Sequence, residues 1–569
     1  MCGIIGYIGY RNKKEVAIKG LKSLEYRGYD SAGIGFINDK IYVFKKVGRV
    51  DELKDVVSDV NATLVIGHTR WATHGGVNEE NAHPQTDCNN NIMLVHNGTI
   101  ENVDELKLKL RNHNFKSETD TELIAHLLEE ELKEKEPLKA LESTLSQLKG
   151  SYALVIGIKG LNKLLFAKQD SPLHIGLGKN EFFLASDIAA FVEYTKKFVP
   201  LMDGDYGYVS LEGYKIFNKG KEVKRDALEV DWEVKDVEKG GYPHFMLKEI
   251  NEQVDVVGNA LAVNTSHIIE MISNANSIHI VAAGTSYHAG YLLKLLLEKY
   301  KSIESDIVVA SEYIFTKKPN KDTVVIAISQ SGETADTLQA VKFAKKNGAR
   351  IVGITNVMGS SLTYLSDEFV VMNAGLEVGV AATKTFTSQV AIAFKIVFGD
   401  KVDKKKVKEA LSSSLKIDIT NLAKKCIHYN KMFFLGRGLS YPIAMEAALK
   451  FKELTYKHAE AYPGGELKHG PLSLMDKDAF IFAFMPDDET FAKMVYTVEE
   501  VKARDAFVAA VSPSNVDKVD VLLNINKEDM PYQLFSFIPL LQLLAYKTSV
   551  LLGNDPDKPR NLAKSITVE

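Results

Sequence analysis

The chain has 569 residues, 45% of them hydrophobic and 25% charged, which is typical of a globular protein with three or four domains. The net charge of −4, with both signs interspersed, argues against nucleic acid or an anionic membrane as a partner. We find no signal peptide and no stretch of transmembrane length. Three dispersed cysteines (Cys2, Cys88 and Cys426) form neither a disulfide framework nor a metal-ligand spacing, so we expect a cytoplasmic protein without metal or cofactor.

The first notable residue is Cys2. A small residue after Met1 usually permits removal of the methionine, which would leave Cys2 at the mature N-terminus. Its thiol would then sit beside its own α-amine, whose pKa is roughly 7.7–8.0, so that nucleophile and general base share one residue. The alternative is a small apolar residue that opens a buried strand.

Short apolar runs rich in β-formers dominate residues 1–225 and predict strands. They lie at 3–8, 32–37, 41–47, 63–67, 92–95, 152–158, 164–167, 182–185 and 207–210. Helical patterns interrupt them at 15–24 and 121–132. This order predicts an α+β domain with two layered sheets.

Polar strings that core packing does not require lie between these runs, at 26–31, 68–75, 96–102 and 117–122. Taken with a thiol nucleophile, they suit attack on the side-chain amide of an amino acid. Asn97 and Gly98 would donate to the oxyanion, Arg70 would bind an α-carboxylate, and Asp120 an α-ammonium. Each also has an ordinary explanation: a tight turn at Asn97-Gly98, a surface charge at Arg70, and a helix N-cap near Asp120.

Together these strings resemble the glutaminase domain of class II, N-terminal-nucleophile, glutamine amidotransferases. The resemblance covers nearly the whole first domain and implies an Ntn-hydrolase-type αββα sandwich. It also implies a γ-glutamyl thioester on the cysteine, release of ammonia, and hydrolysis by water. Carried over to this sequence, Cys2 is the nucleophile, and Asn97 with Gly98 forms the oxyanion hole. The residues that hold glutamine are then Arg70, Thr73, His74 and Asp120.

Residues 226–244 are charged and mixed, and we expect them to form a linker. The remaining chain contains an internal repeat. Gly284-Thr285-Ser286-Tyr287 recurs as Gly438-Leu439-Ser440-Tyr441, and two later strands recur at similar offsets. Strands alternate with helices, so residues 245–400 and 401–555 should form two α/β domains with parallel sheets.

The first copy carries a serine-rich loop over residues 329–334, between a strand and a helix. Hydroxyls and helix-start N–H groups at such a loop can bind a phosphate without lysine or metal. The predicted phosphate contacts are Ser329, Gln330, Ser331 and Thr334 in this loop, with Thr285 and Ser286 at the neighbouring turn. A plain helix N-cap is the alternative. Asp487 and Asp488 occupy the matching turn of the second copy and would repel a phosphate.

The two copies resemble sugar isomerase (SIS) domains. A class II glutaminase joined to two such domains resembles the family of glutamine–fructose-6-phosphate aminotransferases. Strings at 377–384, 460–471 and 559–565 are also close to that family's pattern, which then extends over nearly the whole chain. The resemblance implies conversion of fructose 6-phosphate and glutamine to glucosamine 6-phosphate and glutamate, the first step of hexosamine synthesis, with ammonia passed between the two sites.

The same resemblance assigns roles in isomerisation. Glu453 would shuttle the proton between C1 and C2, although Lys450 and Lys452 also suit an ordinary solvated helix face. Lys450 would assist this transfer, Lys564 would form a Schiff base, and His469, supplied by a neighbouring subunit, would open the sugar ring.

Three further features follow from the resemblance. Val380 would contact the sugar phosphate, and the tail at 556–569 would close over the site. Trp71 would gate the passage between the sites, although a partly buried tryptophan needs no such role. Ala382 stands where a serine is common, which would weaken one sugar contact.

Other functions remain open from the sequence: an amidotransferase acting on another ketose phosphate or mainly hydrolysing glutamine, or a non-catalytic sugar-phosphate sensor. The sensor lacks support because no helix-turn-helix segment or basic patch is evident. Sharing of His469 between subunits implies at least a homodimer.

Overall fold

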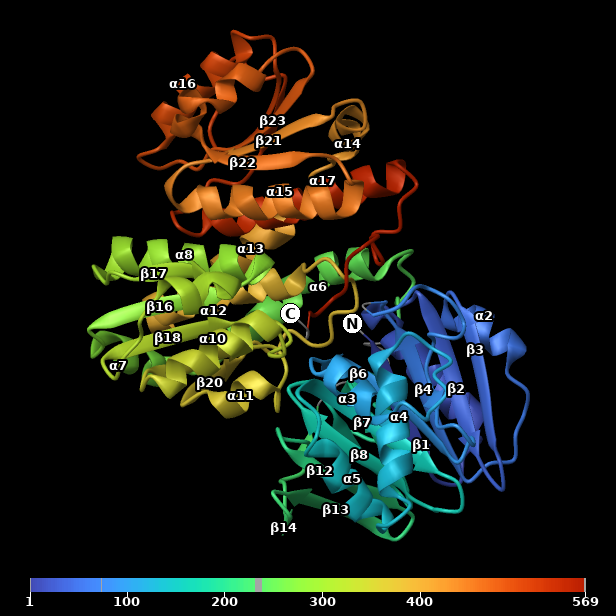
Figure 1. Cartoon of the computed structure of the whole chain (residues 1–569). Helices are drawn as coiled ribbons and strands as arrows, with labels where there is room; N and C mark the ends of the chain where they lie inside the picture. The colour runs from blue at the N-terminus through green and yellow to red at the C-terminus, as the bar shows by residue number, and fades with distance from the viewer. Residues whose placement is uncertain (1, 73, 231–237, 567–569) are drawn as a thin grey trace.

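The computed structural model describes residues 2–72, 74–230 and 238–566 (Figure 1). The first domain contains two antiparallel sheets. One has eight strands in the order β15-β11-β9-β10-β1-β4-β2-β3, and the other has seven in the order β14-β13-β12-β8-β7-β6-β5. The eight-stranded sheet comprises β1 (Gly3–Ile8), β2 (Ser31–Ile37), β3 (Ile41–Val47), β4 (Leu64–Arg70), β9 (His174–Gly178), β10 (Glu181–Ala185), β11 (Lys197–Pro200) and β15 (Leu228–Glu229). The seven-stranded sheet comprises β5 (Gln85–Thr86), β6 (Ile92–Ile100), β7 (Gly150–Ile158), β8 (Leu164–Gln169), β12 (Asp205–Ser210), β13 (Gly213–Asn218) and β14 (Lys221–Val223).

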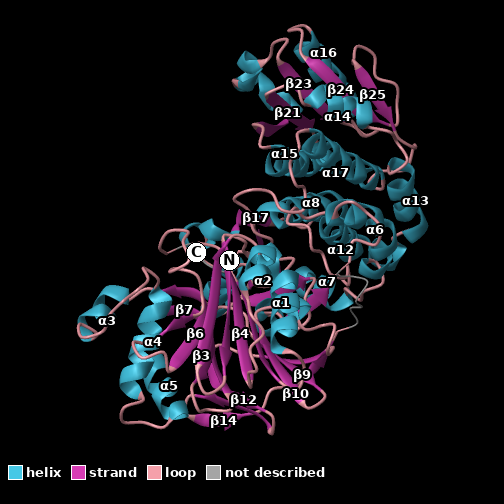
Figure 2. Cartoon of the chain, turned by 90° about the vertical axis from the view of Figure 1, so that its right-hand side faces the viewer, coloured by secondary structure: helices cyan, strands magenta, loops and turns pink. Residues whose placement is uncertain are grey.

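Helices cover the outer faces of the two sheets (Figure 2). Helices α1 (Lys13–Leu24) and α2 (Val50–Val56) pack on the eight-stranded sheet, while α4 (Asp120–Glu131) packs on the other with α3 (Val103–Lys109) and α5 (Pro137–Leu145) beside it. Apolar residues of both sheets, including Ile4, Ile66, Val95 and Phe166, form the core between them. Strand β1 is buried along its whole length because α1 covers one face and the second sheet the other. The predicted αββα sandwich is confirmed.

Two central strands are longer than the sequence suggested. Strand β4 extends to Arg70, and β6 runs from Ile92 to Ile100. Asn97 and Gly98 pair with Ala153 and Tyr152 of β7, so the alternative of a tight turn there is wrong. The apolar pattern ends early because the last residues of these strands are polar and lie at the edge of the sandwich that carries Cys2.

The second and third domains each contain a five-stranded parallel sheet, and the two strand orders correspond: β17-β16-β18-β19-β20 and β22-β21-β23-β24-β25. The first sheet comprises β16 (Ser277–Ala282), β17 (Asp306–Val309), β18 (Thr323–Ile328), β19 (Arg350–Thr355) and β20 (Glu368–Val371). The second comprises β21 (Lys431–Gly436), β22 (Ala459–Pro463), β23 (Ala479–Phe484), β24 (Phe507–Ser512) and β25 (Val521–Asn524). The predicted duplication with parallel sheets is confirmed.

Helices of both copies share one apolar core. Those of the second domain are α6 (Phe245–Ala260), α7 (Ser266–Ser273), α8 (Gly284–Lys301), α9 (Tyr313–Thr316), α10 (Ala335–Lys346), α11 (Ser361–Leu365) and α12 (Lys384–Phe398). Those of the third are α13 (Lys404–Ser414), α14 (Thr420–Cys426), α15 (Tyr441–Thr455), α16 (Phe491–Lys502) and α17 (Gln533–Leu551). Apolar side chains of α6, α8 and α12 join those of α13, α15 and α17 in a single cluster, so the two copies pack as one unit.

Helix α17 corrects one expectation from the sequence. It is long and apolar enough to cross a membrane, with a mean hydropathy of 1.5 over its most apolar window, although we expected no such stretch. Buried residues make up 83% of that window, and α17 packs against α13, α14 and α15. Its apolarity is therefore explained by its place in the core that the two copies share.

The segment after α17 returns to the first domain and crosses between it and the second (red in Figure 1). Lys558 forms an ion pair with Glu25, and the Pro559 carbonyl accepts a hydrogen bond of 3.2 Å from the Tyr29 hydroxyl. Further along, the Ile566 carbonyl accepts a bond of 2.9 Å from the Ala335 N–H. The tail therefore contacts both domains.

Candidate active sites

Cys2 lies immediately before β1, at the end of β1 that pairs with the end of β4. Its sulfur accepts a hydrogen bond from the Trp71 N–H, at 3.3 Å, and lies 3.6 Å from the Trp71 carbonyl. Burial raises the pKa of the Cys2 thiol, and the Trp71 N–H and the nearby Arg70 cation oppose this effect. Cys2 is partly buried and directly precedes the buried strand β1, so its position also suits the alternative of a small residue that opens a buried strand.

Asn97 faces Cys2 from the neighbouring sheet. Its side-chain amide donates a bond of 2.8 Å to the Cys2 carbonyl, while its Oδ1 lies 3.1 Å from Nε2 of the buried His68. The contact with His68 therefore fixes the orientation of the Asn97 amide, so that the NH₂ group of Asn97 points toward Cys2. The amide donor therefore lies beside Cys2, as the predicted role of an oxyanion donor requires.

Gly98 is the one residue of this strand whose conformation demands glycine. Its φ of +130° is rare for other residues, and a Cβ would lie 2.1 Å from the Ser151 carbonyl oxygen. We expect Gly98→Ala to lower the free energy of unfolding by about 2 kcal/mol or more and to impair glutamine hydrolysis. Urea denaturation and a glutaminase assay measure the two effects. Gly160→Ala is the control, because Gly160 also has a positive φ (+80°) but nothing lies within 4 Å. An equal loss in both variants would contradict a role for the close approach at Gly98.

Arg70 is buried at the end of β4 and braces the loop that follows. Its guanidinium donates to the carbonyls of His74, Gly75 and Gly76, at 2.5, 3.1 and 3.0 Å. The side chain of His74 is exposed, and Thr73, the other residue predicted in this loop, lies outside the described residues. The surface-charge alternative for Arg70 is wrong, since only 3% of the residue is exposed.

Asp120, the first residue of α4, is also buried. Its Oδ2 accepts a hydrogen bond of 2.9 Å from the Ile100 N–H, and its Oδ1 lies 3.7 Å from Nδ1 of His96. Burial alone would raise the pKa of Asp120, but His96 and the Ile100 N–H outweigh it and hold the pKa below its usual range. The carboxylate is therefore ionised at neutral pH, and Arg70 is close enough to interact with both Asp120 and Cys2.

Trp71 follows Arg70 and is half-buried. Its ring packs edge-on against that of Tyr29, with 5.7 Å between centroids. Because the Tyr29 hydroxyl also donates to the Pro559 carbonyl, Tyr29 contacts both Trp71 and the C-terminal tail.

The serine-rich loop lies between β18 and α10, at the carboxyl edge of the second sheet. The Ser329 hydroxyl accepts a bond of 3.0 Å from the Gly332 N–H and pairs with the Thr334 hydroxyl at 2.9 Å. Gln330 lines the cavity described below, and the Ser331 hydroxyl pairs with that of Ser565, in the tail, at 2.9 Å. The tail therefore reaches the predicted phosphate loop.

The second predicted phosphate turn follows β16, the parallel neighbour of β18. Both turns lie at the same sheet edge, but the Thr285 hydroxyl donates to Glu446 of α15 at 3.0 Å. The Ser286 hydroxyl accepts a bond of 2.8 Å from Gln389 of α12. The structure thus brings the two turns together while pairing these hydroxyls with protein groups that sequence reasoning missed.

Lys564 is buried in an ion pair with Glu377. The Glu377 carboxylate also accepts bonds from the N–H and hydroxyl groups of Thr383 and Thr385, at 2.6–3.2 Å. Burial opposes its ionisation, but Lys564 and these donors hold the pKa of Glu377 well below its ordinary value. Sequence reasoning placed Glu377 in a family-like string without a role, since its partners are distant in sequence.

Glu249 is a second buried carboxyl in this cluster. Its Oε1 accepts bonds from the Val378 and Gly379 N–H groups, and its Oε2 has no hydrogen-bond partner. Burial, together with the charge of Glu377, raises the pKa of Glu249 to about 8. The folded protein therefore keeps Glu249 protonated over a pH range in which the unfolded chain ionises it.

The raised pKa predicts a pH-dependent effect of Glu249→Gln, which mimics the protonated carboxyl. As pH rises from the ordinary pKa of 4.5 to about 8, the parent loses stability because only its unfolded state releases this proton. We expect the variant and the parent to have the same melting temperature near pH 4.5, and the variant to have the higher melting temperature near pH 8. Its advantage in the free energy of unfolding should grow by about 1.4 kcal/mol for each pH unit between these limits. Thermal melts across this range test the effect, with the exposed Glu270→Gln as control. A difference in melting temperature that is independent of pH would contradict the prediction.

Glu453, Lys450 and Glu446 form a chain of charges along α15. The ammonium group of Lys450 lies 2.6 Å from Glu453 and 3.5 Å from Glu446, and its side chain is only 2% exposed. The neighbour Lys452 is exposed. The alternative of an ordinary solvated face therefore applies to Lys452, while Glu453 is half-buried beside a buried cation.

His469 lies apart from these groups in a single chain. It ends a 3₁₀ helix (Gly464–His469) of the third domain and is exposed. Within the described residues it makes no hydrogen bond or ion pair with Glu453 or Lys564. Val380, by contrast, is buried, and its N–H donates to the Asp557 carbonyl of the tail at 3.2 Å.

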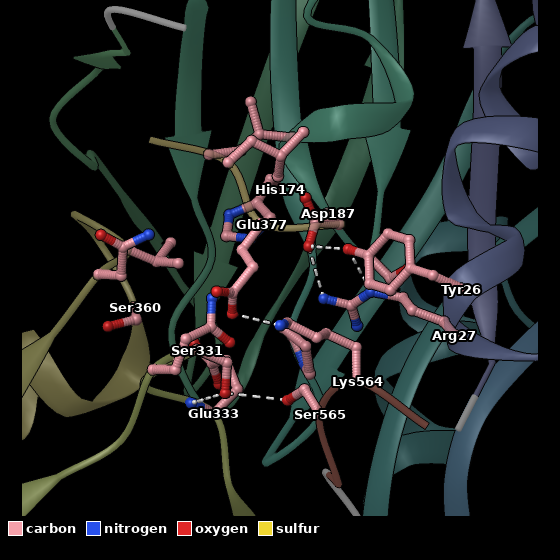
Figure 3. Close-up of a pocket in the computed structure, with 17 residues that line it drawn as sticks. Tyr26, Arg27, His174, Asp187, Ser331, Glu333, Ser360, Glu377, Lys564 and Ser565 are labelled. Atoms are coloured by element: carbon pink, nitrogen blue, oxygen red, sulfur yellow. Dashed lines mark hydrogen bonds and ion pairs between the residues drawn. The ribbon is translucent and has the colours of Figure 1, made fainter. Parts of the chain in front are cut away.

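A cavity of about 40 Å³ lies where the first domain, the second domain and the C-terminal tail meet (Figure 3). The first domain contributes Arg27, whose guanidinium pairs with Asp187 at 2.7 Å. The second contributes Ser331, and the tail contributes Lys564. The unusual string at 26–31 thus borders the sugar-side loop, a contact that no local pattern predicts.

Comparison with known proteins identifies the domains of the chain. Residues 68–193 match the model of the glutamine amidotransferase domain, and residues 271–393 and 426–521 match that of the SIS domain. Among solved structures, the C-terminal domain of glucosamine-fructose-6-phosphate aminotransferase from Francisella tularensis is similar, with a TM-score of 0.53 and 35% identity. The match covers 56% of this chain and 99% of that one.

Full-length relatives extend the match over the whole chain. The glutamine–fructose-6-phosphate aminotransferase (isomerizing) of Thermococcus kodakarensis is 46% identical over an alignment of 602 positions, gaps included, which covers 100% of both chains. The enzyme of the same name from Thermotoga maritima is 43% identical over 608, again with complete coverage. The chain therefore belongs to the family of isomerizing glutamine–fructose-6-phosphate aminotransferases.

Proposed function

We propose that this protein converts D-fructose 6-phosphate and L-glutamine to D-glucosamine 6-phosphate and L-glutamate, supplying hexosamine synthesis in the cytoplasm. The observation that carries this proposal is the path of the tail. Lys558 and Pro559 contact Glu25 and Tyr29 on the glutaminase side, whereas Lys564 and Ser565 contact Glu377 and Ser331 on the sugar side. One segment thus contacts both candidate sites, which supports the transfer of ammonia between them.

In the glutaminase half, the Cys2 thiolate attacks the amide carbon of glutamine, and the oxyanion binds the Asn97 amide and the Gly98 N–H. The C–N bond then breaks, ammonia leaves, and water hydrolyses the thioester to glutamate. Arg70, Thr73, His74 and Asp120 hold the amino acid. The α-amine of Cys2 acts as the base once Met1, which lies outside the described residues, has been removed.

In the isomerase half, the phosphate binds at residues 329–334, assisted by Thr285, Ser286 and Val380. His469 of a neighbouring subunit protonates the ring oxygen, and Lys564 forms a Schiff base at C2 of the open ketose. Ammonia replaces the lysine at C2. Glu453, assisted by Lys450, then moves a proton from C1 to C2, which yields the amino aldose. The net change is addition of ammonia and loss of water.

The ion pair of Lys564 with Glu377 has a consequence for this sequence of steps. An ammonium held by a carboxylate is not nucleophilic, so Lys564 must leave Glu377 and lose a proton before it can attack the ketone. The half-buried Trp71, one contact away from the same tail, is well placed to gate ammonia when the tail moves.

Incubation with fructose 6-phosphate and glutamine carrying heavy nitrogen in its amide tests the proposal. We expect labelled glucosamine 6-phosphate, with little dilution when unlabelled ammonium is added. An active glutaminase that forms no amino sugar would overturn it, and would favour the rival functions of glutamine hydrolysis or of another ketose phosphate.

Sharing of His469 has its own test. Mixed oligomers of His469→Ala and Glu453→Gln should regain activity that neither variant has alone, since one site would receive both intact residues. No recovery after verified subunit exchange would exclude a shared site and with it this argument for a homodimer.

A further inference from the structure

A cluster of metal-ligating side chains lies outside both candidate sites, in the first domain. It consists of Cys88, His113, His126 and Glu129, and their potential ligand atoms all lie within 4.8 Å of one another. Cys88 precedes β6, His113 lies between α3 and α4, and the other two lie on α4. We propose that these four residues bind a structural zinc ion.

Four distances between the ligand atoms match a tetrahedral zinc site. With Zn–S near 2.3 Å and Zn–N and Zn–O near 2.0–2.1 Å, tetrahedral geometry separates S from N by about 3.6 Å and N from O by about 3.4 Å. The Cys88 sulfur lies 3.4 Å from Nδ1 of His113 and 3.6 Å from Nδ1 of His126. Oε2 of Glu129 lies 3.1 Å and 3.3 Å from the same two nitrogens.

The ligand types also favour zinc over magnesium and calcium. Thiolate and imidazole groups select against magnesium and calcium, which prefer oxygen, and four protein ligands leave no open position for catalysis. One thiolate and one carboxylate balance the charge of a divalent cation. Partial burial, with side-chain exposures of 1% for His126, 7% for His113 and 13% for Glu129, limits competition from water.

Each histidine also has a carboxylate on the side away from the cluster. Nε2 of His113 lies 2.7 Å from Glu130, within hydrogen-bond distance, whereas Nε2 of His126 lies 3.6 Å from Glu122 and makes no hydrogen bond. A hydrogen-bonded outer carboxylate such as Glu130 fixes the tautomer of a metal-bound imidazole, because the outer nitrogen carries the proton and the inner one binds the metal. Both imidazoles thus direct Nδ1 inward.

This inference departs from the expectation of no metal, which rested on the spacing of cysteines alone. The His126-x-x-Glu129 spacing places two ligands on one helical face, but the sequence does not indicate that Cys88 and His113 lie beside them. A metal here would fix the hairpin before β6 and the loop at 110–119 to α4. Since α4 begins at Asp120, it would also hold the proposed glutamine contact in place.

Metal analysis of the full-length protein tests the proposal directly. We expect about one zinc per chain after purification or after addition of zinc chloride. Cobalt in place of zinc should give a thiolate-to-metal charge-transfer band and the absorption of a tetrahedral ion. Cys88→Ser and His113→Ala should lose the metal, whereas Cys426→Ser and the exposed His428→Ala should retain it. Glu130→Gln should weaken affinity by about 10–100-fold.

Two results would overturn the site. The first is that the parent protein holds no zinc and takes up none. The four residues would then form only a hydrogen-bonded cluster. The other is zinc retained in both Cys88→Ser and His113→Ala. Cobalt absorption of the parent decides the matter even if the variants fold poorly. A change in the KM for glutamine would be informative only if the proposed function is correct. The metal content tests the zinc site independently of that function.

Discussion

Replacing Cys2 with alanine should abolish glutamine-dependent formation of glucosamine 6-phosphate. The thiol is the only candidate nucleophile beside the Asn97 amide within the described part of the chain, and no neighbouring group can form the thioester in its place. We expect the rate to fall by about 10⁴-fold or more, as when the covalent nucleophile of another hydrolase is removed. Quantification of glutamate and amino sugar from the same reaction measures the loss.

The isomerase half provides an internal control. With ammonium chloride as nitrogen source, Cys2→Ala should still form glucosamine 6-phosphate, because Cys2 lies outside the sugar site. Cys426→Ala removes a buried thiol of the third domain and should retain both activities. Glutamine-dependent synthesis by Cys2→Ala at a rate near that of the parent would exclude the nucleophile. An intact-mass measurement of the mature chain tests the base, since a retained Met1 would leave Cys2 without a free α-amine.

The sequence predicted the architecture well where burial is uniform. Strand β1 is apolar on both faces because helices and a second sheet cover it, and the parallel strands β18 and β23 are buried throughout. Such runs identify strands without knowledge of their partners. The repeat was visible because both copies keep the same order of elements.

Polar strand ends could not be predicted in this way. His68 and Asn97 lie within strands, yet their side chains meet across the two sheets and orient the amide toward Cys2. Hydrophobic periodicity ends where such residues begin, so the predicted strands stop short of the ends of β4 and β6. Functional residues interrupt the very pattern that locates a strand.

Contacts between segments that are distant along the chain also could not be predicted from the sequence. Glu446 pairs with Thr285 and His288, and Glu249 lies against the loop at 378–379, although neither glutamate belongs to a recognisable motif. The cluster around Cys88 likewise joins three segments. In each case the chemistry arises from tertiary packing rather than from spacing along the chain.

Glu453→Gln should separate the two reactions most sharply. The change removes the carboxylate that would carry the proton from C1 to C2 but keeps the shape of the side chain. We expect kcat for glucosamine 6-phosphate to fall by about 10²–10⁴-fold, the usual contribution of a general base, with little change in the KM for fructose 6-phosphate. Glutamine hydrolysis should continue, because Cys2 lies in another domain.

The surroundings of Glu453 explain why the effect should be specific to chemistry. Lys450 is buried 2.6 Å from Glu453 and also lies 3.5 Å from Glu446, so it keeps one carboxylate partner in the variant. The fold should therefore survive, and thermal melting of the variant checks this. Glu499→Gln, which removes a carboxylate paired with Lys518 on the surface of the same domain, is the matched control and should retain both reactions. If Glu453→Gln lost glutamine hydrolysis and amino-sugar synthesis equally, the carboxylate would be structural. If Glu453→Gln still formed glucosamine 6-phosphate at the rate of the parent, a group other than Glu453 would have to carry the proton.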